Sequence, residues 1–478
     1  MIYGLGSLLA KLLGFLLLPI YTRYLTPADY GILSLLVVTG SVADILIRVG
    51  FGSAIFREVI YRGTDESLVE STALYFLAGE SALFLGAFIF LSPRLSWLIF
   101  GAPAYAHLLS LVFIGSLLDV LDVIAMAKLR IHERSLLYAI ISVSKFLVGA
   151  LLNIYFIVIL RRGVEGLVIS GLIQSALSAG VSLTLIISDL KPTFSIPILQ
   201  RMLSFGIPLI PFGLSRLVMT YADRYFLQHY CTTAEVGLYS LGYSIAMVLN
   251  IIVGAVQTAW PAQMFAMAKK AEAERNFSRI LTYYLTILGF IGLVFSVLAH
   301  EVLMIMTTPQ FHRASTVVPL IVLSYLLYGA MFMTNTGLET QNKLKYMSPI
   351  IVGSAAVNLG LNYLLIPPYG MMGAAVATFI AYLFLAIVNT AVNLRLWRIP
   401  YQYDRIGKIA LAWGLIYGAS LLIGVPNVWL SGILKLLLLA TFPLLLYGFR
   451  FYEDGELARF QQLLQSGWSR WFAWRTGA

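Results

Sequence analysis

The sequence predicts an all-α, polytopic membrane protein of about 14 transmembrane helices. Two pseudo-symmetric six-helix bundles would be followed by two extra C-terminal helices. Three observations lead to this fold class: an apolar composition, basic residues concentrated in alternate loops, and an internal repeat. Of 478 residues, 60% are hydrophobic and 11% are charged, whereas soluble domains carry about 25% charged residues. A globule surrounded by water is therefore excluded.

Stretches long enough to span a bilayer recur along the whole chain. A transmembrane helix needs about 20 predominantly apolar residues. The predicted spans are residues 2–22, 31–53, 70–91, 106–127, 137–160, 164–187, 204–228, 236–260, 280–299, 314–338, 348–366, 371–392, 407–424 and 428–448.

Basic side chains are distributed unequally between the two sides of this arrangement. With a cytoplasmic N-terminus, 21 of the 32 Lys and Arg residues fall in inside loops and the tail, and 5 fall in outside loops. The positive-inside rule then predicts that both termini are cytoplasmic. The same rule accounts for the net charge of +10 without a nucleic-acid partner. Residues Glu456 to Trp474 have apolar side chains at helical spacing among basic ones, which predicts an amphipathic helix on the membrane surface.

The chain also repeats itself. Ala28–Leu35 returns as Ala234–Leu241 at an offset of 206, and Gly163–Gly166 returns as Gly370–Gly373 at an offset of 207. Each repeat contains six helices, an even number, so the two copies share one orientation in the membrane. We expect an N-terminal lobe at 1–200, a C-terminal lobe at 201–400, extra helices at 401–450 and a cytoplasmic tail at 451–478.

Several cations fall inside the spans, where a charge costs about 2.5–3.5 kcal/mol and suggests a function. Lys11 and Arg216 lie in the first helix of each repeat, at similar depth. Two cations that face each other across the central axis repel unless an anion lies between them. We therefore predict an anion site near the midplane, formed by Lys11, Arg48, Lys145 and Arg216. The alternative is that each cation pairs with an acid of its own bundle.

Other charges in the spans favour gating or structural roles. Asp44 and Arg48 are four residues apart and share a helix face, so they can form an ion pair that an anionic ligand would open. Asp223 and Arg224 are adjacent and point in different directions, so each needs its own partner near an outer gate. Lys435 is expected to be structural or to reach toward the membrane surface.

Three carboxylates are candidates for ion coupling. Glu80 is central in its span, and Asp119 and Asp122 lie three residues apart on one helix face. Buried carboxylates can carry protons, so H⁺ or Na⁺ could drive transport through them. Hydrogen bonds to neighbouring hydroxyl and backbone groups are the structural alternative.

We expect no catalytic residues, no metal site and no other cofactor. The chain has one cysteine, Cys231, and five scattered histidines, so neither a thiolate cluster nor a zinc motif is expected. It has no P-loop, and its predicted outer loops are no longer than about fifteen residues. Transport is therefore the simplest function for this architecture.

Several motifs together resemble the polysaccharide (O-antigen type) flippases of the multidrug/oligosaccharidyl-lipid/polysaccharide exporter superfamily. The resemblance covers nearly the whole chain. Its motifs are Lys11–Phe15, Leu18–Gly31, Asp223–Leu227, Glu235–Ser240 and Ile366–Ala375.

This resemblance implies fourteen helices in two lobes with a V-shaped central cavity. It implies movement of a polyprenyl-pyrophosphate-linked oligosaccharide from the cytoplasmic to the outer leaflet by rocking of the lobes, for O-antigen, capsule or exopolysaccharide synthesis. The location would be a bacterial cytoplasmic (inner) membrane, with polysaccharide polymerase machinery as a possible partner. The prenyl tail could lie in a groove of helices 13 and 14. In the related lipid II flippases, the cation at the position of Lys11 meets pyrophosphate. Lysine here replaces a frequent arginine and loses its bidentate geometry.

Alternative functions stay open at this point. A cation-coupled multidrug exporter of the same superfamily would favour twelve helices and an acidic cavity. A membrane glycosyltransferase or polymerase would need longer outer loops. A flippase for another lipid-linked precursor would share all the features above.

Overall fold

The computed structural model describes residues 17–270, 272–453 and 455–456, and within these residues the regular structure is helical, without strands. The predicted span 2–22 lies mostly outside the described residues. The elements up to residue 206 are α2 (Leu18–Tyr24), α3 (Pro27–Arg48), α4 (Phe51–Phe56), η1 (Arg57–Tyr61), α5 (Glu66–Phe100), η2 (Pro103–Tyr105), α6 (Ala106–Leu118), α7 (Val120–Ile131), α8 (Ser135–Ile154), η3 (Tyr155–Ile159), α9 (Gly163–Ile186), η4 (Ile187–Asp189) and α10 (Ile196–Gly206).

The remaining elements continue the all-helical pattern. They are α11 (Leu209–Tyr230), α12 (Thr233–Ala268), α13 (Ala273–Met306), η5 (Pro309–Val317), α14 (Val318–Thr334), α15 (Thr336–Thr340), η6 (Leu344–Tyr346), α16 (Met347–Leu396), α17 (Tyr403–Leu421), α18 (Val428–Ala440) and α19 (Phe442–Gly448).

Eleven helical segments among the described residues are long and apolar enough to cross a membrane. One of them, α16, contains two of the predicted spans, so the eleven segments contain twelve of the predicted spans. The helix α17 coincides with predicted span 407–424 and falls outside this set of eleven. The all-helical membrane fold is thus confirmed, and the number fourteen stays a prediction.

The N-terminal caps of α3 and α12 are equivalent, as the sequence repeat is. The Thr26 hydroxyl accepts a hydrogen bond from the backbone N–H of Asp29 at 3.2 Å at the start of α3. At the start of α12 the Thr232 hydroxyl accepts from the backbone N–H of Glu235, also at 3.2 Å. Side-chain caps of this kind satisfy N–H groups that have no partner in the first helical turn. Both copies of the repeat therefore begin their second helix in the same way.

The second repeated motif sets a chain reversal in each half. Gly163 and Gly370 both have φ of +54°, a conformation that glycine adopts without steric cost. The kink at Gly370 divides α16 into two helical halves, one for each predicted span. This explains why two spans appear as one long element.

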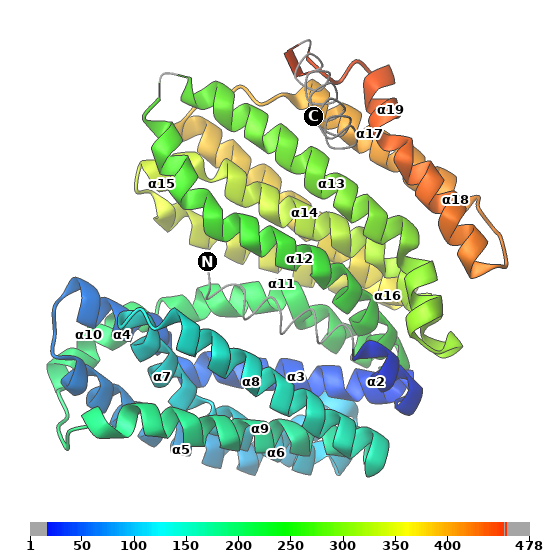
Figure 1. Cartoon of the computed structure of the whole chain (residues 1–478). Coiled ribbons are helices and arrows are strands. Elements are labelled where there is room, and N and C mark those ends of the chain that lie inside the picture. The colour runs from blue at the N-terminus through cyan, green and yellow to red at the C-terminus, as the bar shows by residue number, and fades with distance from the viewer. Residues whose placement is uncertain (1–16, 271, 454, 457–478) are drawn as a thin grey trace, which may run out of the picture.

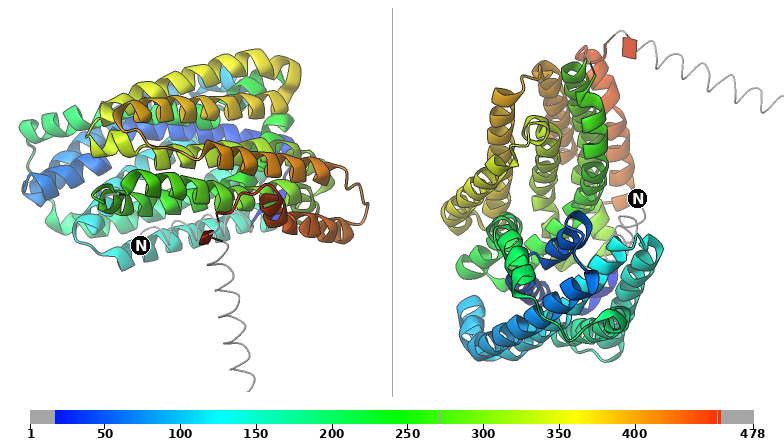
Figure 2. Two further views of the ribbon diagram at one scale, coloured as in Figure 1. Left: turned by 90° about the horizontal axis from the view of Figure 1, so that it is seen from above. Right: turned by 90° about the vertical axis from the view of Figure 1, so that its left-hand side faces the viewer.

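The helices form two groups that lie one above the other (Figure 1). The elements from α2 to α10 form the lower group, and those from α12 to α19 form the upper one; the view along the helices shows the same division (Figure 2, right). Separate apolar clusters hold them together. One cluster draws its buried members from residues 36–202, and another draws nearly all of them from residues 227–401. A third joins α17, α18 and α19 to α13.

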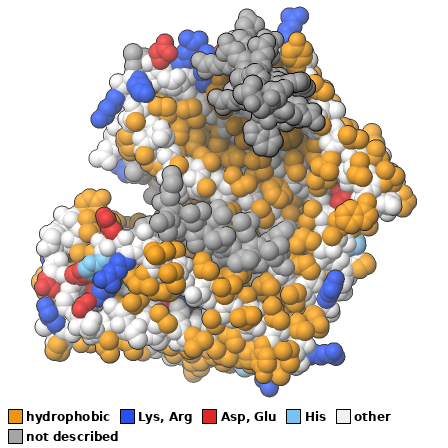
Figure 3. All heavy atoms as spheres, viewed as in Figure 1, with side chains coloured by type: hydrophobic (Ala, Val, Ile, Leu, Met, Phe, Trp, Pro, Cys, Tyr) orange, Lys and Arg blue, Asp and Glu red, His pale blue; other side chains and the backbone are white. Residues whose placement is uncertain are grey.

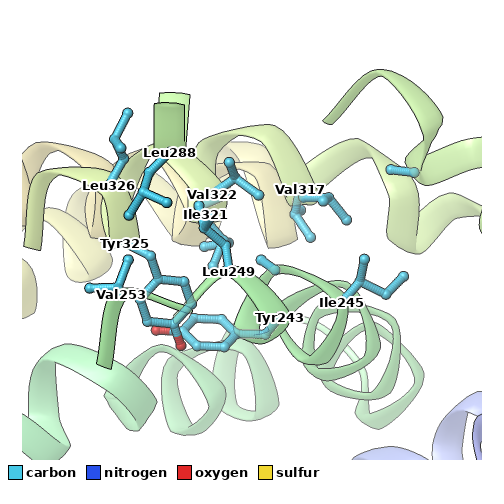
Figure 4. Packing of buried hydrophobic residues seen from close by; sticks show 14 of the residues in the cluster. Tyr243, Ile245, Leu249, Val253, Leu288, Val317, Ile321, Val322, Tyr325 and Leu326 are labelled. Atoms are coloured by element: carbon cyan, nitrogen blue, oxygen red, sulfur yellow. The ribbon is translucent and has the colours of Figure 1, made fainter. Parts of the chain in front are cut away.

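The core of the upper group is aliphatic with tyrosines at its lower edge (Figure 4). The rings of Tyr243 and Tyr325 meet edge to face, with centroids 5.8 Å apart. Leu249, Val322 and Leu326 pack around them. The tyrosines therefore lie where this core approaches the space between the two groups.

The two groups converge at one end of the molecule. In Figure 1 the starts of α3 and α12 lie together on the right, and α4, α10 and α15 lie on the left. The space-filling view is hollowed between the groups on the left (Figure 3). The left end carries the loops that the charge distribution places in the cytoplasm.

Candidate functional site

A cavity of about 720 Å³ lies between the two groups of helices. One wall is the second half of α3, and the other walls come from α11, α12, α14 and α16. Among the predicted site residues it contains Asp44, Arg48 and Arg216. Of the four predicted anion-binding residues, Arg48 and Arg216, one from each repeat, therefore share this cavity. Lys145 does not line it, and Lys11 lies outside the described residues.

Arg48 lies on the wall of the cavity and is held by its own helix. Its guanidinium donates to Asp44 Oδ2 at 2.9 Å, and both side chains are about one-third exposed, Arg48 at 38% and Asp44 at 31%. Arg48 Nε and Asp44 Oδ1 have no hydrogen-bond partner among the described residues. The pair is therefore partly exposed at the cavity wall and incompletely hydrogen-bonded.

Arg216 is the exposed cation of the same cavity. Within the described part of the chain its side chain has no carboxylate within 4 Å. A basic group beside a cavity, without an acid to neutralise it, favours negative charge there.

A second cavity of about 640 Å³ lies in the lower group and includes Arg48 in its wall. Arg130 and Lys145 also line it, together with the hydroxyl residues Tyr138 and Ser142. Arg48 thus belongs to both cavities. Basic side chains extend from the space between the groups into the N-terminal bundle.

Lys145 is bound by acids of its own bundle, as the structural alternative required. Its Nζ lies 2.9 Å from Asp119 Oδ1 and 2.5 Å from Asp122 Oδ2. The Asp122 carboxylate also accepts hydrogen bonds from Ser178 and Ser182. These carboxylates therefore hold a cation and hydroxyl groups at the wall of the second cavity.

Glu80 is separate from both cavities. It lies in the middle of α5, half-buried, and lines none of the cavities described. Its Oε2 has no hydrogen-bond partner among the described residues. The structure does not bring Glu80 together with Asp119 and Asp122.

Asp223 and Arg224 have different partners, in keeping with their adjacent positions. Tyr239 donates its hydroxyl to Asp223 Oδ2 at 2.5 Å. The Arg224 guanidinium stacks over the rings of Tyr221 and Tyr243, at 4.5 Å and 5.3 Å from their centroids. Both side chains are buried, so their place is within the packing of the C-terminal lobe.

Lys435 is also buried and structural. Its Nζ lies 2.6 Å from Glu301 Oε1, which accepts a further hydrogen bond from Ser431. This pair fixes α18 to α13. The sequence alone does not reveal this partner of Lys435, because Glu301 is 134 residues away.

The aromatic lining of the main cavity was missed from the sequence. Tyr221, Tyr325, Tyr328 and Tyr382 come from three helices and meet at this wall. The three-residue spacing of Tyr325 and Tyr328 puts them on one helix face, which is the one available signal. Two amides, Asn250 and Gln257, lie in the same wall.

An apolar cavity of about 620 Å³ opens elsewhere in the C-terminal lobe. It lies between α13, α14, α16 and the extra helix α17. Leucine, alanine and isoleucine side chains dominate its lining, and α17 contributes Tyr403 and Trp413. Such a surface suits a hydrocarbon chain.

Comparison with known proteins identifies a relative of this chain. The chain is 25% identical over 208 residues to the "Probable low-salt glycan biosynthesis flippase Agl15" of Haloferax volcanii, which is 41% of this chain and 43% of that protein. The match thus spans less than half of the length of this relative.

Solved structures show the same fold. The lipid II flippase MurJ in an inward closed conformation has a TM-score of 0.67 at 16% identity, over 92% of this chain and 98% of that one. An inward-facing multidrug resistance MATE transporter of the MOP superfamily has a TM-score of 0.61 at 18% identity, over 81% and 94%. The chain thus has the transporter fold of the MOP superfamily.

The sequence profile of one family covers more than half of the chain. Residues 20–316 match the family described as polysaccharide biosynthesis protein. This range includes α3, α11 and α12, which form much of the cavity with Arg48 and Arg216. The chain is therefore a multi-pass membrane protein that belongs to the polysaccharide biosynthesis protein family.

Proposed function

We propose that this protein is a flippase that moves a polyprenyl-pyrophosphate-linked oligosaccharide across the membrane for surface polysaccharide synthesis. The observation that carries the proposal is the cavity between the two groups of helices, in which Arg216 is exposed and pairs with no carboxylate of the described residues. A sugar-pyrophosphate head is too polar to cross hydrocarbon alone, because unpaired charge in an apolar medium is costly. The cavity offers charges that replace its hydration.

Each predicted cation has a part in this proposal. Arg216 and Arg48 would bind the pyrophosphate in the main cavity, and Lys11 would be a further cationic ligand. Arginine forms paired hydrogen bonds to phosphate, and lysine acts as a point charge. Binding of pyrophosphate would open the Asp44–Arg48 pair. Lys145 would act as a reserve ligand in the second cavity, after release from Asp119 and Asp122.

Tyrosines and amides of the main cavity would bind the glycan. Tyr325, Tyr328 and Tyr382 give flat faces with hydroxyl groups, and Asn250 and Gln257 give donors and acceptors. The prenyl tail would stay in hydrocarbon surroundings, in the apolar cavity beside α17. This gives the helices beyond the repeat a role in binding lipid.

Alternating access would carry the head group across. The hollow between the groups opens toward the loops that hold most basic residues, which favours loading from the cytoplasm in a bacterial inner membrane. Asp119, Asp122 or Glu80 would couple the return step to H⁺ or Na⁺. Polymerase machinery would receive the product on the outer side.

A reconstituted flipping assay tests this proposal. Proteoliposomes would carry a fluorescent polyprenyl-pyrophosphate oligosaccharide, and quenching from outside would report its leaflet. A charged hydrogen bond contributes about 1.5–3 kcal/mol, so Arg216→Ala and Lys11→Ala should each slow flipping about 10- to 100-fold. Arg94→Ala is the matched control, because Arg94 is exposed and lines neither basic cavity.

Two outcomes would contradict the proposal. Flipping by folded Arg216→Ala protein at the unmodified rate would remove the basic cavity from the mechanism. Export of cationic dyes without any lipid flipping would instead assign the protein to the multidrug exporters.

A further inference from the structure

The second cavity, in the N-terminal bundle, has a basic wall of its own. Of the described residues that line it, three are cations, Arg48, Arg130 and Lys145, and one, Asp122, is an acid. Its volume of about 640 Å³ falls in the range of about 300–1,000 Å³ that is usual for ligand pockets. The charge of this lining therefore favours an anion, in a space of the size that small ligands occupy.

Two of these cations are already neutralised by neighbouring acids. Arg48 donates to Asp44 at 2.9 Å, and Lys145 pairs with both Asp119 and Asp122. A cation that is paired in this way has little net attraction left for another anion, because its partner repels that anion. The attraction of the cavity for an anion therefore depends on the third cation.

That third cation, Arg130, is exposed and is held at the wall by backbone groups. Its Nε donates to the carbonyl oxygen of Met126 at 3.3 Å, one turn earlier in α7. A second nitrogen of the guanidinium donates to the carbonyl oxygen of Gly52 in α4 at 3.5 Å. No carboxylate of the described residues lies within 4 Å of this guanidinium. A guanidinium has five N–H donors, so Arg130 keeps donors for a ligand.

Residues with hydroxyl groups line the same cavity as Arg130. They are Ser53 of α4 and Tyr138 and Ser142 of α8. Each hydroxyl can donate and accept hydrogen bonds, as the hydroxyl groups of a sugar do. A cation without an acidic partner among hydroxyl groups matches a sugar that carries a negative charge.

Arg48 connects this cavity to the main one, because it lines both. It is the last residue of α3, and the helix breaks after it at Val49 and Gly50, which have φ of +42° and +68°. Arg216 lines the main cavity and Arg130 lines the second one. A pyrophosphate at Arg216 therefore leaves the charge of Arg130 for another anionic group of the substrate.

We propose that the second cavity binds an acidic sugar of the lipid-linked oligosaccharide, with Arg130 as the residue that binds its carboxylate. The inference rests on the proposed flippase function and deepens it, because it narrows the substrate to an anionic glycan. Arginine pairs with a carboxylate through two parallel hydrogen bonds. The pyrophosphate lies beside Arg216, and the glycan extends past Arg48 into the second cavity.

A matched pair of substrates tests this site. Two fluorescent polyprenyl-pyrophosphate oligosaccharides differ in one unit, glucuronate in one and glucose in the other, and their flipping is compared in proteoliposomes. The unmodified protein should flip the glucuronate lipid at least tenfold faster than the glucose lipid. Arg130→Gln should lower this preference at least tenfold. Arg130→Lys should keep part of it, because the charge remains and the paired geometry is lost.

Two further variants are controls for this comparison. Arg134→Gln removes a charge from the turn after α7, and Arg134 is exposed and lines neither basic cavity, so the preference should stay unchanged. Arg216→Gln should slow both lipids alike, because both carry the pyrophosphate. An equal loss of both lipids in Arg130→Gln would overturn the acidic-sugar site and leave the flippase function standing.

A binding measurement separates the site from transport. A soluble tetrasaccharide with one glucuronate should raise the melting temperature of the protein in detergent, since a ligand of the folded state stabilises it. The glucose counterpart should raise it less than half as much, and Arg130→Gln should remove the difference. Equal shifts with the unmodified protein, or a difference that Arg130→Gln leaves intact, would overturn the site. If the unmodified protein flips neither lipid, the proposed function fails, and these shifts alone decide whether the site exists.

Discussion

Single cations in this protein are stabilised in three different ways. Lys435 is buried against Glu301, Lys145 bridges two aspartates, and Arg216 is exposed to a cavity. A buried charge needs a partner, because its desolvation is otherwise uncompensated. The degree of pairing therefore separates structural cations from those free to bind a ligand.

The Lys145 cluster yields a prediction at the residue scale. Asp122→Asn should lower the free energy of unfolding by about 1–3 kcal/mol, because hydrogen bonds from Lys145, Ser178 and Ser182 lose their charged acceptor. Asp119→Asn should cost less, since Lys145 is its one hydrogen-bond donor among the contacts above. Thermal unfolding in detergent measures both.

Lys145→Met combined with Asp122→Asn should cost less than the sum of the two single losses, because both changes remove the same ion pair. Lys145→Met alone should cost the more of the two, since it also leaves Asp119 without its cation. An additive or larger loss in the double variant would show that the cluster does not act through this ion pair.

At the scale of elements, the packing of α18 against α13 combines an apolar surface with a polar contact. The cluster that joins α17, α18 and α19 to α13 is aliphatic and aromatic. Within it, Lys435 and Ser431 of α18 both bond to Glu301 of α13. Apolar packing between helices in a membrane does little to fix the position of one helix along the other. The contact with Glu301 therefore sets the position of α18 along α13.

Lys435→Met should therefore destabilise the docked helix by about 3–5 kcal/mol, because Glu301 would be left buried with an unpaired charge. Limited proteolysis between α17 and α19, together with thermal unfolding, measures the loss. Lys408→Met is the control, since Lys408 pairs with an exposed Asp404 four residues away and such surface pairs contribute about 0.3–0.5 kcal/mol. Combining Glu301→Gln with Lys435→Met should restore stability. No recovery would mean that the charges are not the cause.

At the scale of the whole molecule, charge asymmetry predicts the orientation in the membrane. The loop around Lys269 belongs to the basic side, and the turn around Arg162 belongs to the opposite side. Both residues are exposed, so each can report its side by labelling. Burial and the neighbouring Glu235 raise the pKa of the native Cys231 thiol to about 11, so this thiol is a weak nucleophile at neutral pH.

In intact cells, an impermeant maleimide should label Arg162→Cys and spare Lys269→Cys, each in the Cys231→Ser background. Permeabilised cells should label both. The reverse pattern in intact cells would place the basic loops outside and turn the open end of the cavity toward the outer surface.

The sequence by itself determined the class of the fold and the place of most helices. Spans such as 70–91 and 236–260 are set by a local requirement, since backbone groups in hydrocarbon must be bonded within the helix. The repeat of Gly163–Gly166 as Gly370–Gly373 was equally readable, and both leading glycines adopt the same positive φ. Local physics fixes these features, so they can be read without a structure.

The tertiary structure decided which of the charged residues pair with one another. Sequence spacing paired Asp44 with Arg48, but it could not join Lys145 to Asp119 and Asp122, or Lys435 to Glu301, across tens or hundreds of residues. It also could not show that Gly31 and Gly237 touch, although both lay in the repeat. Pairing across helices depends on how their faces rotate and pack, and an apolar sequence leaves that rotation undefined. The assembled bundle alone brings Arg48 and Arg216 to the wall of one cavity.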